Sequence, residues 1–262
     1  MRPRNRVMEK RKPTRFARAN WLAISYGLLV LSSIGVCAAD KKAAAAPAVD
    51  SGSFAVMMHG QRVATETFSI SQDSKGSSIT SRFKSEAGAE KAEQSSNLEL
   101  NADGDLHRYE WKELSPGQSH AVVEPDGNFL IEHVWKTPTD KPLDQPFLLP
   151  ASTSILDDYF FVQREVLAWR YLATTCNHDK GTIQCPLKQK EQMGTLNPHI
   201  RASQPVSVSY VGREKITIHG TERELIRLDM TADSGDWSLW LDDSLKLQRI
   251  VAPVENTEVV RD

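Results

Sequence analysis

The sequence lacks the short motifs by which many enzymes are identified. It contains no G-x-S-x-G, H-E-x-x-H, G-x-G-x-x-G or P-loop pattern, the signatures of nucleophile elbows, zinc proteases, dinucleotide sites and phosphate loops. None of the seven histidines has another histidine three or four positions away, so no helical metal pair is expected. We therefore expect no cofactor and no metal ion. Whether the protein is an enzyme stays open, with a non-enzymatic role favoured.

Basic residues are scarce once the N-terminal leader is set aside. The whole chain has 32 basic and 34 acidic residues. Eight of the basic residues and one acidic residue lie in the leader, so the remainder has 24 basic against 33 acidic residues. An acidic chain has little with which to neutralise phosphates, and nucleic acid is therefore not an expected partner.

The sequence has one long uncharged apolar run, from Trp21 to Val36, and it is short of the roughly 20 residues that a membrane-spanning helix needs. A basic segment precedes this run and small residues follow it, which is typical of a secretory signal peptide. We assign residues 1–39 to the signal peptide and residues 40–52, rich in alanine and proline, to a disordered spacer. The protein is expected to be exported, periplasmic or secreted, without a transmembrane span after cleavage. The alternatives are membrane anchoring by an uncleaved leader or by a lipid on Cys37.

Three cysteines are present, and Cys37 lies in the leader. The other two, Cys176 and Cys185, flank a polar loop that contains a glycine. In an oxidising compartment an even pair of this kind predicts a disulfide. Free thiols, or a metal site that adds His178, are the alternatives left open.

Alternating apolar and polar residues predict many strands. Between residues 53 and 135 the alternating runs are separated by turn signals such as Asp103-Gly104 and Pro125-Asp126-Gly127. Four prolines in residues 136–150 interrupt the pattern, because proline suits neither a helix interior nor a central strand. Strands resume in the last quarter of the chain.

Two adjacent acids, Asp242 and Asp243, lie between two alternating runs near the end of the chain. A catalytic carboxylate pair would have to be partly buried in a cleft. Aspartate and serine between two strands instead favour a turn, because their side chains bind nearby backbone amides. We therefore interpret this segment as the tip of a hairpin.

One helix is predicted between Ile155 and Leu172, capped by Ser152, Thr153 or Ser154. Its apolar side chains recur every three or four residues and form a broad stripe that should pack against a sheet. The predicted fold is mainly β, with a single domain at residues 53–262. A curved antiparallel sheet of about ten to twelve strands, or an unclosed barrel, wraps the single amphipathic helix.

Aromatic and apolar side chains supply the candidate binding surface. If the helix covers a cavity, seven side chains should line an apolar-ligand site: Tyr109, Trp111, Phe129, Trp135, Tyr159, Val166 and Trp169. Filling a solid core is the commoner role of such residues. His133 shares a predicted strand face with Phe129 and Trp135, and we interpret it as a hydrogen-bonded core residue.

Two segments resemble uncharacterised exported bacterial proteins. Residues 225–262, which contain DWSLWLDDSLKLQRIVAP, share with that group a tryptophan-rich strand, a WLDD-like turn, a strand ending in Arg-Ile and a final Val-Arg. The predicted helix, ILDDYFFVQREVLAWRYL, is similar to the same group. More remotely, the pattern resembles the unclosed β-barrel of periplasmic lipoprotein carriers, which implies an apolar cavity between sheet and helix. The first resemblance implies no activity, and the second is an analogy of fold.

Three functions are compatible with these observations. The favoured one is a non-enzymatic binding or carrier protein for an apolar, lipid-like ligand. The second is a structural or interaction domain with a filled core, whose partner would be another envelope protein. The third is an envelope hydrolase. A cavity larger than about 300 Å³ favours the carrier, a solid core favours the second function, and converging polar groups with shifted pKa values favour the hydrolase.

Overall fold

The computed structural model describes residues 48–86, 91–179, 182–233 and 235–262. The predicted signal peptide and most of the predicted spacer lie outside these residues. Among the described residues, no helix has the length and apolar character needed to cross a membrane.

Among the described residues, fifteen strands form one sheet and two short strands form a separate hairpin. The first eight strands are β1 (Ala48–Met58), β2 (Gln61–Asp73), β3 (Gly76–Ser85), β4 (Glu93–Asn101), β5 (Leu106–Ser115), β6 (His120–Asp126), β7 (Phe129–Trp135) and β8 (Leu143–Phe147). Then come β9 (Ser154–Ile155), α1 (Val162–Thr175), β10 (Asn177–Asp179), β11 (Thr182–Gln184), β12 (Lys190–Asn197), β13 (Ala202–Ile218), β14 (Thr221–Ala232), β15 (Gly235–Leu241), β16 (Leu247–Ala252), the 3-10 turn η1 (Pro253–Glu255) and β17 (Thr257–Arg261).

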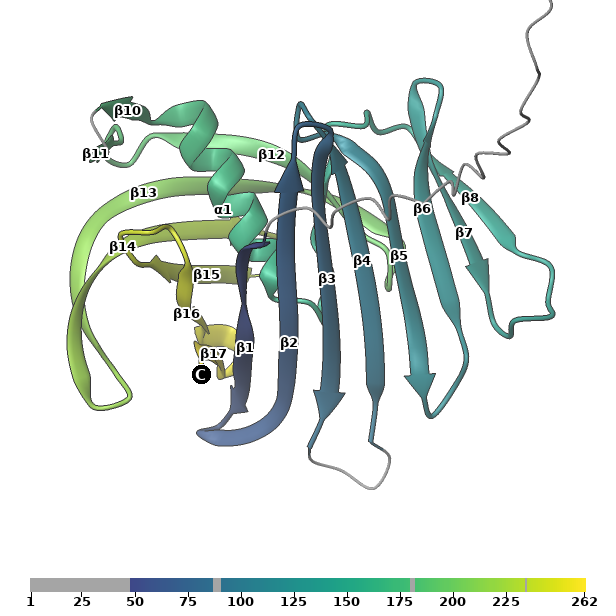
Figure 1. The fold of residues 1–262 in the computed structure, drawn as a ribbon, viewed down its shortest axis with the longest axis horizontal. Helices are drawn as coiled ribbons and strands as arrows, with labels where there is room; N and C mark the ends of the chain where they lie inside the picture. The colour runs from purple at the N-terminus through teal and green to yellow at the C-terminus, as the bar shows by residue number, and fades with distance from the viewer. Residues whose placement is uncertain (1–47, 87–90, 180–181, 234) are drawn as a thin grey trace, which may run out of the picture. The chain divides into compact units, whose positions relative to one another are not determined.

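The sheet consists of two antiparallel meanders, β1–β8 and β12–β17, joined through β1 and β17. Phe54 pairs with Arg261 and Met58 with Thr257, so strands from the two ends of the described chain lie side by side in the middle of the sheet. The free edges belong to β8 and β9, which do not pair with each other. Figure 1 shows both meanders curving around α1. The predicted fold class, a curved unclosed sheet around one helix, is confirmed, although the predicted number of strands was too small.

Strand β1 begins five residues earlier than the sequence suggested. Residues 48–52, assigned to the spacer, pair with β2, and Asp50 within them is buried. Its carboxylate accepts hydrogen bonds from Arg261 Nη2 at 2.7 and 2.8 Å and forms an ion pair with Lys246 at 2.9 Å. Small and polar residues did not predict a strand here, because the stabilising contacts come from distant parts of the chain.

Helix α1 begins at Val162, seven residues later than predicted. The predicted first residue, Ile155, instead belongs to β9, which pairs in parallel with β12. The N-cap residue, Phe161, makes no capping hydrogen bond with its side chain. The cap comes from Glu66 on β2, whose carboxylate accepts hydrogen bonds from the Phe161 amide at 2.7 Å and the Val162 amide at 3.3 Å. A carboxylate at this position also interacts favourably with the positive end of the helix dipole.

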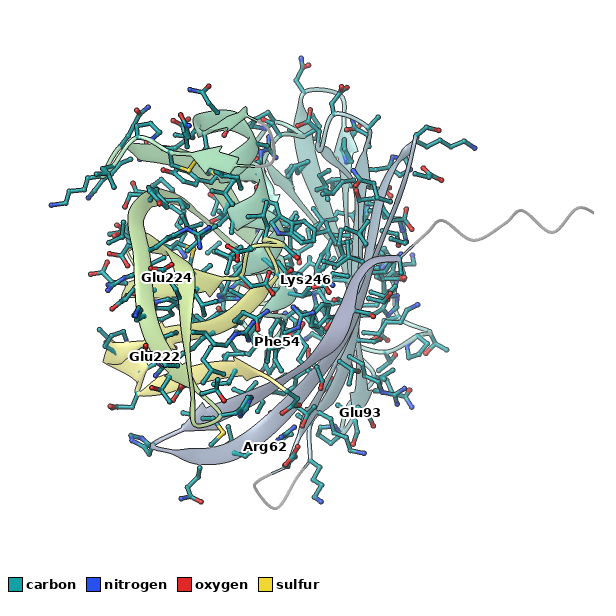
Figure 2. All side chains as sticks on the ribbon, turned by 60° about the vertical axis from the view of Figure 1, so that its left-hand side comes forward. Phe54, Arg62, Glu93, Glu222, Glu224 and Lys246 are labelled. Atoms are coloured by element: carbon teal, nitrogen blue, oxygen red, sulfur yellow. A yellow bond between two sulfur atoms is a disulfide. The ribbon has the colours of Figure 1, made fainter. Side chains whose placement is uncertain are left out.

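The core lies between α1 and the concave face of the sheet. Phe54, at the junction of the two meanders, is fully buried, and its ring stacks on that of Phe68 with centroids 4.8 Å apart. Figure 2 shows side chains filling the space inside the curve, with Phe54 among them and Glu222 and Glu224 on the outer hairpin of β13 and β14.

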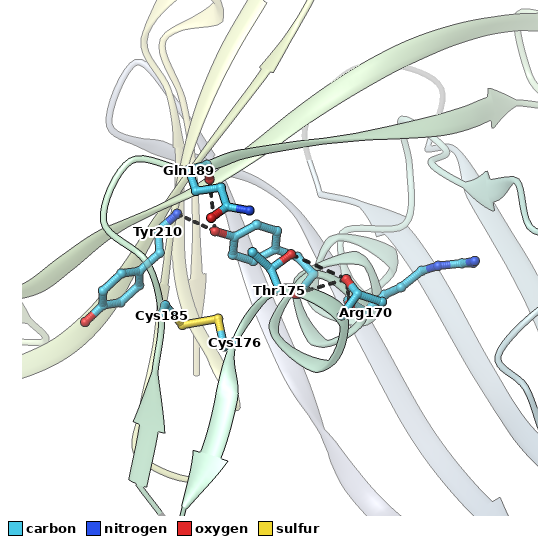
Figure 3. Close-up of a disulfide and its surroundings, with 8 residues drawn as sticks. Arg170, Thr175, Cys176, Cys185, Gln189 and Tyr210 are labelled. Carbon is cyan, nitrogen blue, oxygen red and sulfur yellow. Dashed lines mark hydrogen bonds between the residues drawn. A yellow bond between two sulfur atoms is a disulfide. The ribbon is translucent and has the colours of Figure 1, made fainter.

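The helix ends at a disulfide. Cys176 follows the last turn of α1 and is bonded to Cys185, with the two Sγ atoms 2.11 Å apart, so the predicted bridge is present in the structure (Figure 3). Beside it, the Tyr171 hydroxyl accepts a hydrogen bond from the Tyr210 amide at 2.9 Å and donates one to the Gln189 carbonyl at 3.2 Å. The bridge and Tyr171 together fasten the end of α1 to the start of the second meander.

The interpretation of Asp242 and Asp243 as a turn is confirmed, since they connect β15 to β16. Asp242 Oδ1 accepts hydrogen bonds from the amides of Ser244 and Lys246 at 2.9 and 3.0 Å. Asp243 is exposed and forms an ion pair with Arg213 at 2.7 Å. Both acids therefore stabilise the turn of this hairpin.

Candidate functional site

Three consecutive polar residues near the start of α1 are buried. Gln163, Arg164 and Glu165 are only 1 %, 2 % and 0 % exposed. A helix on one face of a sheet normally turns its polar residues toward water. Here the sheet curves around the first turns of α1, so these side chains need polar partners inside the protein.

A polar cluster beside the start of α1, which we term the His199 cluster, consists of Gln94, Tyr109, Asp157 and His199. Asp157 is fully buried, and its Oδ2 accepts a hydrogen bond from the Tyr109 hydroxyl at 2.7 Å. The same oxygen lies 2.6 Å from His199 Nδ1, while His199 Nε2 lies 2.7 Å from Gln94 Oε1. The cluster thereby ties strands β4 and β5 to the segments before α1 and after β12.

Aromatic rings enclose this cluster. Trp111 stacks on the His199 ring with centroids 4.0 Å apart, and Tyr159 lies against it at 4.7 Å. Burial, together with the charge of Asp157, raises the pKa of the Tyr109 hydroxyl well above its ordinary value, so Tyr109 acts as a donor. Because both ring nitrogens of His199 are engaged, the arrangement suits an anchor of the fold better than a base directed at a substrate.

Glu132 on β7 adds an isolated carboxyl group to the interior. It is fully buried, and neither of its oxygens has a hydrogen-bond partner among the described residues. Burial raises the pKa of Glu132 to about 7, against the opposing effect of the Arg201 charge. A carboxyl group without partners is stable in such a place only when it is protonated.

One cavity has a volume of about 650 Å³ and lies beside the start of α1. We call it the large cavity. Its wall comes from β1–β3, from the segment before α1 and from β13–β15, and it is mainly apolar: Val56, Val63, Phe83, Leu156, Phe161, Met230, Ala232 and Trp237. Three exposed carboxylates contribute to its lining: Asp158, Asp233 and Glu255. Arg164 also lines it.

A second cavity of about 340 Å³, the small cavity, lies farther along α1. Its apolar lining comes from β2–β4 and from one side of the helix: Ile70, Ile79, Leu98, Leu100, Val166, Leu167, Trp169 and Ala173. Arg170 also lines it and forms an ion pair with Asp105 at 3.4 Å.

The structure distributes the seven predicted ligand-lining residues over several places. Tyr159 lines the large cavity, whereas Val166 and Trp169 line the small one. Tyr109 belongs to the His199 cluster and Trp111 covers it. They do not form one site.

The prediction that Phe129 and Trp135 face the interior was wrong. The buried face of β7 carries Leu130 and Glu132, whereas Phe129 and Trp135 are partly exposed on the other face. There Trp135 stacks on His120 with ring centroids 4.4 Å apart. His133 shares this outer face, and its Nδ1 lies 2.7 Å from Asp144 Oδ1, so it is hydrogen-bonded but does not belong to the core.

Sequence reasoning missed Arg164 and His199, the two residues around which the interior is organised. Arg164 does not belong to the predicted apolar stripe of the helix, and no motif contains it. His199 was one of seven histidines without informative spacing. The available signal was the polar triplet Gln163-Arg164-Glu165 inside a strongly apolar segment, which is compatible with a helix enclosed by its sheet.

Comparisons with known proteins identified no relative of this chain. A scan of protein-family models, a search of curated proteins and a search of solved structures each gave no match. The resemblance to exported bacterial proteins stays a prediction. Among the described residues, no group of three or more histidine, cysteine or acidic side chains is arranged to hold a metal ion. The cavities and the side chains that line them are therefore the features that bear on function.

Proposed function

We propose that the protein binds or carries a lipid-like ligand whose apolar part occupies the large cavity. The supporting observation is the volume of about 650 Å³ behind a mainly apolar wall. Small-molecule sites typically range from about 300 to 1,000 Å³ and combine apolar walls with a few placed polar groups. Export through the predicted signal peptide is part of the proposal.

The gain from apolar burial is large enough for measurable affinity. Each methylene removed from water contributes about 0.8 kcal/mol, so ten of them contribute about 8 kcal/mol. Loss of translational and rotational freedom costs from about 4 kcal/mol upward. A ligand with a long acyl chain is therefore a better fit than a small apolar molecule, which would gain too little.

The positions of the lining residues also indicate the orientation of such a ligand in the large cavity. Val56, Leu156 and Trp237 provide buried apolar surface, whereas Asp158, Asp233 and Glu255 are exposed to solvent. An amphiphile would place its chain against the first group and its polar end near the second. The large cavity is therefore a better candidate for a lipid-like molecule than for a wholly apolar one.

Filling the large cavity is expected to abolish ligand binding, whereas filling the small cavity should not. Ala232→Phe places a ring in the large cavity, and Ala173→Phe is the matched change in the small cavity. Wild-type protein and both variants would be purified from an exporting bacterial cell and extracted with organic solvent for mass spectrometry. We expect about one lipid per chain in the wild type and in Ala173→Phe, and at least a ten-fold loss in Ala232→Phe, as when most of the burial gain is removed.

Circular dichroism would establish that both variants fold. Folded wild-type protein that yields no lipid and does not bind a fluorescent fatty-acyl probe would overturn the proposal, and a structural or interaction role would then be the better account. Equal loss in both variants would show that the large cavity is not the specific site.

A further inference from the structure

Arg164 is a charged group placed in the wall of an otherwise mainly apolar cavity. Its side chain extends from the first turn of α1 into the lining of the large cavity. The guanidinium carbon lies 4.3 Å from the ring centroid of Trp237 and 5.1 Å from that of Phe161. Both aromatic residues line the same cavity, so the guanidinium group is held by rings that a ligand in the cavity would also contact.

The hydrogen bonds of Arg164 are incomplete. A guanidinium group has five N–H donors. Nη1 donates to the Asp157 carbonyl at 2.9 Å, whereas Nε is buried and has no partner among the described residues. A buried charged donor without an acceptor is costly. Nε has almost no accessible surface, so a ligand oxygen in the large cavity would be bound by another N–H of the guanidinium group.

The charges around Arg164 indicate what kind of oxygen fits. Burial lowers the pKa of Arg164, and the nearby carboxylates of Asp158, Glu66, Asp157 and Glu255 act in the opposite direction. Carboxyl groups of the protein therefore already interact with this positive charge. An anionic head group would be repelled by those that are ionised, whereas a carbonyl oxygen would accept a hydrogen bond without adding a negative charge.

We propose that the ligand is an acyl ester or amide without net negative charge, and that its carbonyl oxygen accepts a hydrogen bond from the Arg164 guanidinium group. This inference rests on the proposed function. It adds the chemical class of the ligand: the apolar chain lies along Trp237 and the apolar wall, the carbonyl meets Arg164, and a neutral or cationic head lies near Asp158, Asp233 and Glu255.

A pair of lipids that differ only at the carbonyl tests this assignment. The ester 1-hexadecanoylglycerol and the ether 1-O-hexadecylglycerol would compete with a fluorescent fatty-acyl probe on the full chain, with hexadecanoate as the anionic comparison. In the wild type the ester should bind about ten-fold more tightly than the ether, as expected for one charge-assisted hydrogen bond. The ester should also bind more tightly than hexadecanoate.

Replacement of Arg164 with methionine should make the ester and the ether equal. Arg170→Met is the matched control, because Arg170 lies on the same helix but lines the small cavity, and it should keep the ten-fold preference. If Arg164→Met does not fold, the comparison of ester and ether on the wild type still decides the question.

The outcomes separate the two proposals. Equal binding of ester and ether to the wild type would overturn the role of the carbonyl while leaving the lipid-binding function in place. If hexadecanoate bound most tightly of the three lipids, the inference that the ligand has no net negative charge would be overturned. Binding of none of the three lipids would overturn the proposed function itself.

Discussion

Replacing Asp157 with alanine is expected to lower the free energy of unfolding by about 3 to 5 kcal/mol, because each buried donor left without an acceptor costs about 1 to 3 kcal/mol. The change leaves the Tyr109 hydroxyl and His199 Nδ1 without their common acceptor. It also removes the hydrogen bond that Asp157 Oδ1 accepts from the Tyr159 amide at 3.0 Å. Urea unfolding followed by tryptophan fluorescence would measure the loss.

The neighbouring residue provides the control for this experiment. Asp158 is exposed, and Asp158→Ala should change the free energy of unfolding by less than about 1 kcal/mol, as is usual for surface substitutions. If Asp157→Ala were as stable as Asp158→Ala, the His199 cluster would not be the anchor that joins the two sides of the sheet.

Stability is also expected to fall as the pH rises from about 5 to 9, by an amount on the order of 10 kcal/mol. Three buried glutamates cause this dependence. Burial raises the pKa of Glu66 and of Glu132 to about 7. It raises the pKa of Glu165 to about 9, with a further contribution from the nearby charge of Asp50 and an opposing one from Arg261.

The sign follows from proton binding. In the unfolded chain these groups titrate near 4.5, so between that pH and their folded pKa values the folded protein binds more protons. Their stabilising contribution is therefore complete below pH 4.5 and is lost as the pH rises through 7 and then 9. The pKa of Asp50 is lowered by its bonds to Arg261 and Lys246 despite the opposing effect of burial, so its contribution is lost only below the ordinary value of 3.8.

Glu165→Gln isolates the upper part of this profile. The variant should lose the fall in stability between pH 7 and 9. It should keep roughly two thirds of the fall between pH 5 and 7, because Glu66 and Glu132 still titrate there whereas the share of Glu165 is removed. Glu222→Gln is the control, because that side chain is 68 % exposed and should leave the profile unchanged. Thermal unfolding at a series of pH values would show the difference, and a wild-type stability that rises from pH 5 to 9 would contradict the burial of neutral carboxyl groups.

Local signals predicted the hairpins of this fold. The turns at Asp103-Gly104 and Pro125-Asp126-Gly127 connect β4 to β5 and β6 to β7, and Gly104 and Gly127 have φ angles of 81° and 63°. Positive φ is favourable for glycine, so these turns can be predicted from a few residues. The pairing of β1 with β17, in contrast, depends on residues about 200 positions apart and has no local signal.

The start of α1 shows the same limit. Ser152, Thr153 and Ser154 are good capping residues, and the sequence favoured a helix just after them. The helix is instead capped by the carboxylate of Glu66, which accepts a hydrogen bond from the amide of Phe161, 95 residues later in the sequence. An interaction that depends on the curvature of the whole sheet cannot be derived from the residues around the helix.

Strand β7 shows why the candidate site was misplaced. Its sequence alternates Phe129, Ile131, His133 and Trp135 with Leu130, Glu132 and Val134. This alternation predicts that the face with two aromatic rings is the inner one. Glutamate is rarely fully buried without a partner, so the presence of Glu132 predicts that its face of the strand is the outer one. Protonation of Glu132 in the folded protein removes most of the free-energy cost of burying a charge. Protonation cannot be predicted from the alternation of residues alone.

Photo-crosslinking with 1-hexadecanoylglycerol that carries a diazirine near the end of its acyl chain would test the central claim most directly. Peptide mapping of the labelled protein would locate the bound chain. We predict labels on the strands that line the large cavity, at Val56, Phe83 or Trp237, and their loss in Ala232→Phe. Labels concentrated on Val166 and Trp169 in the small cavity, or spread over the outer face of the sheet, would contradict the account.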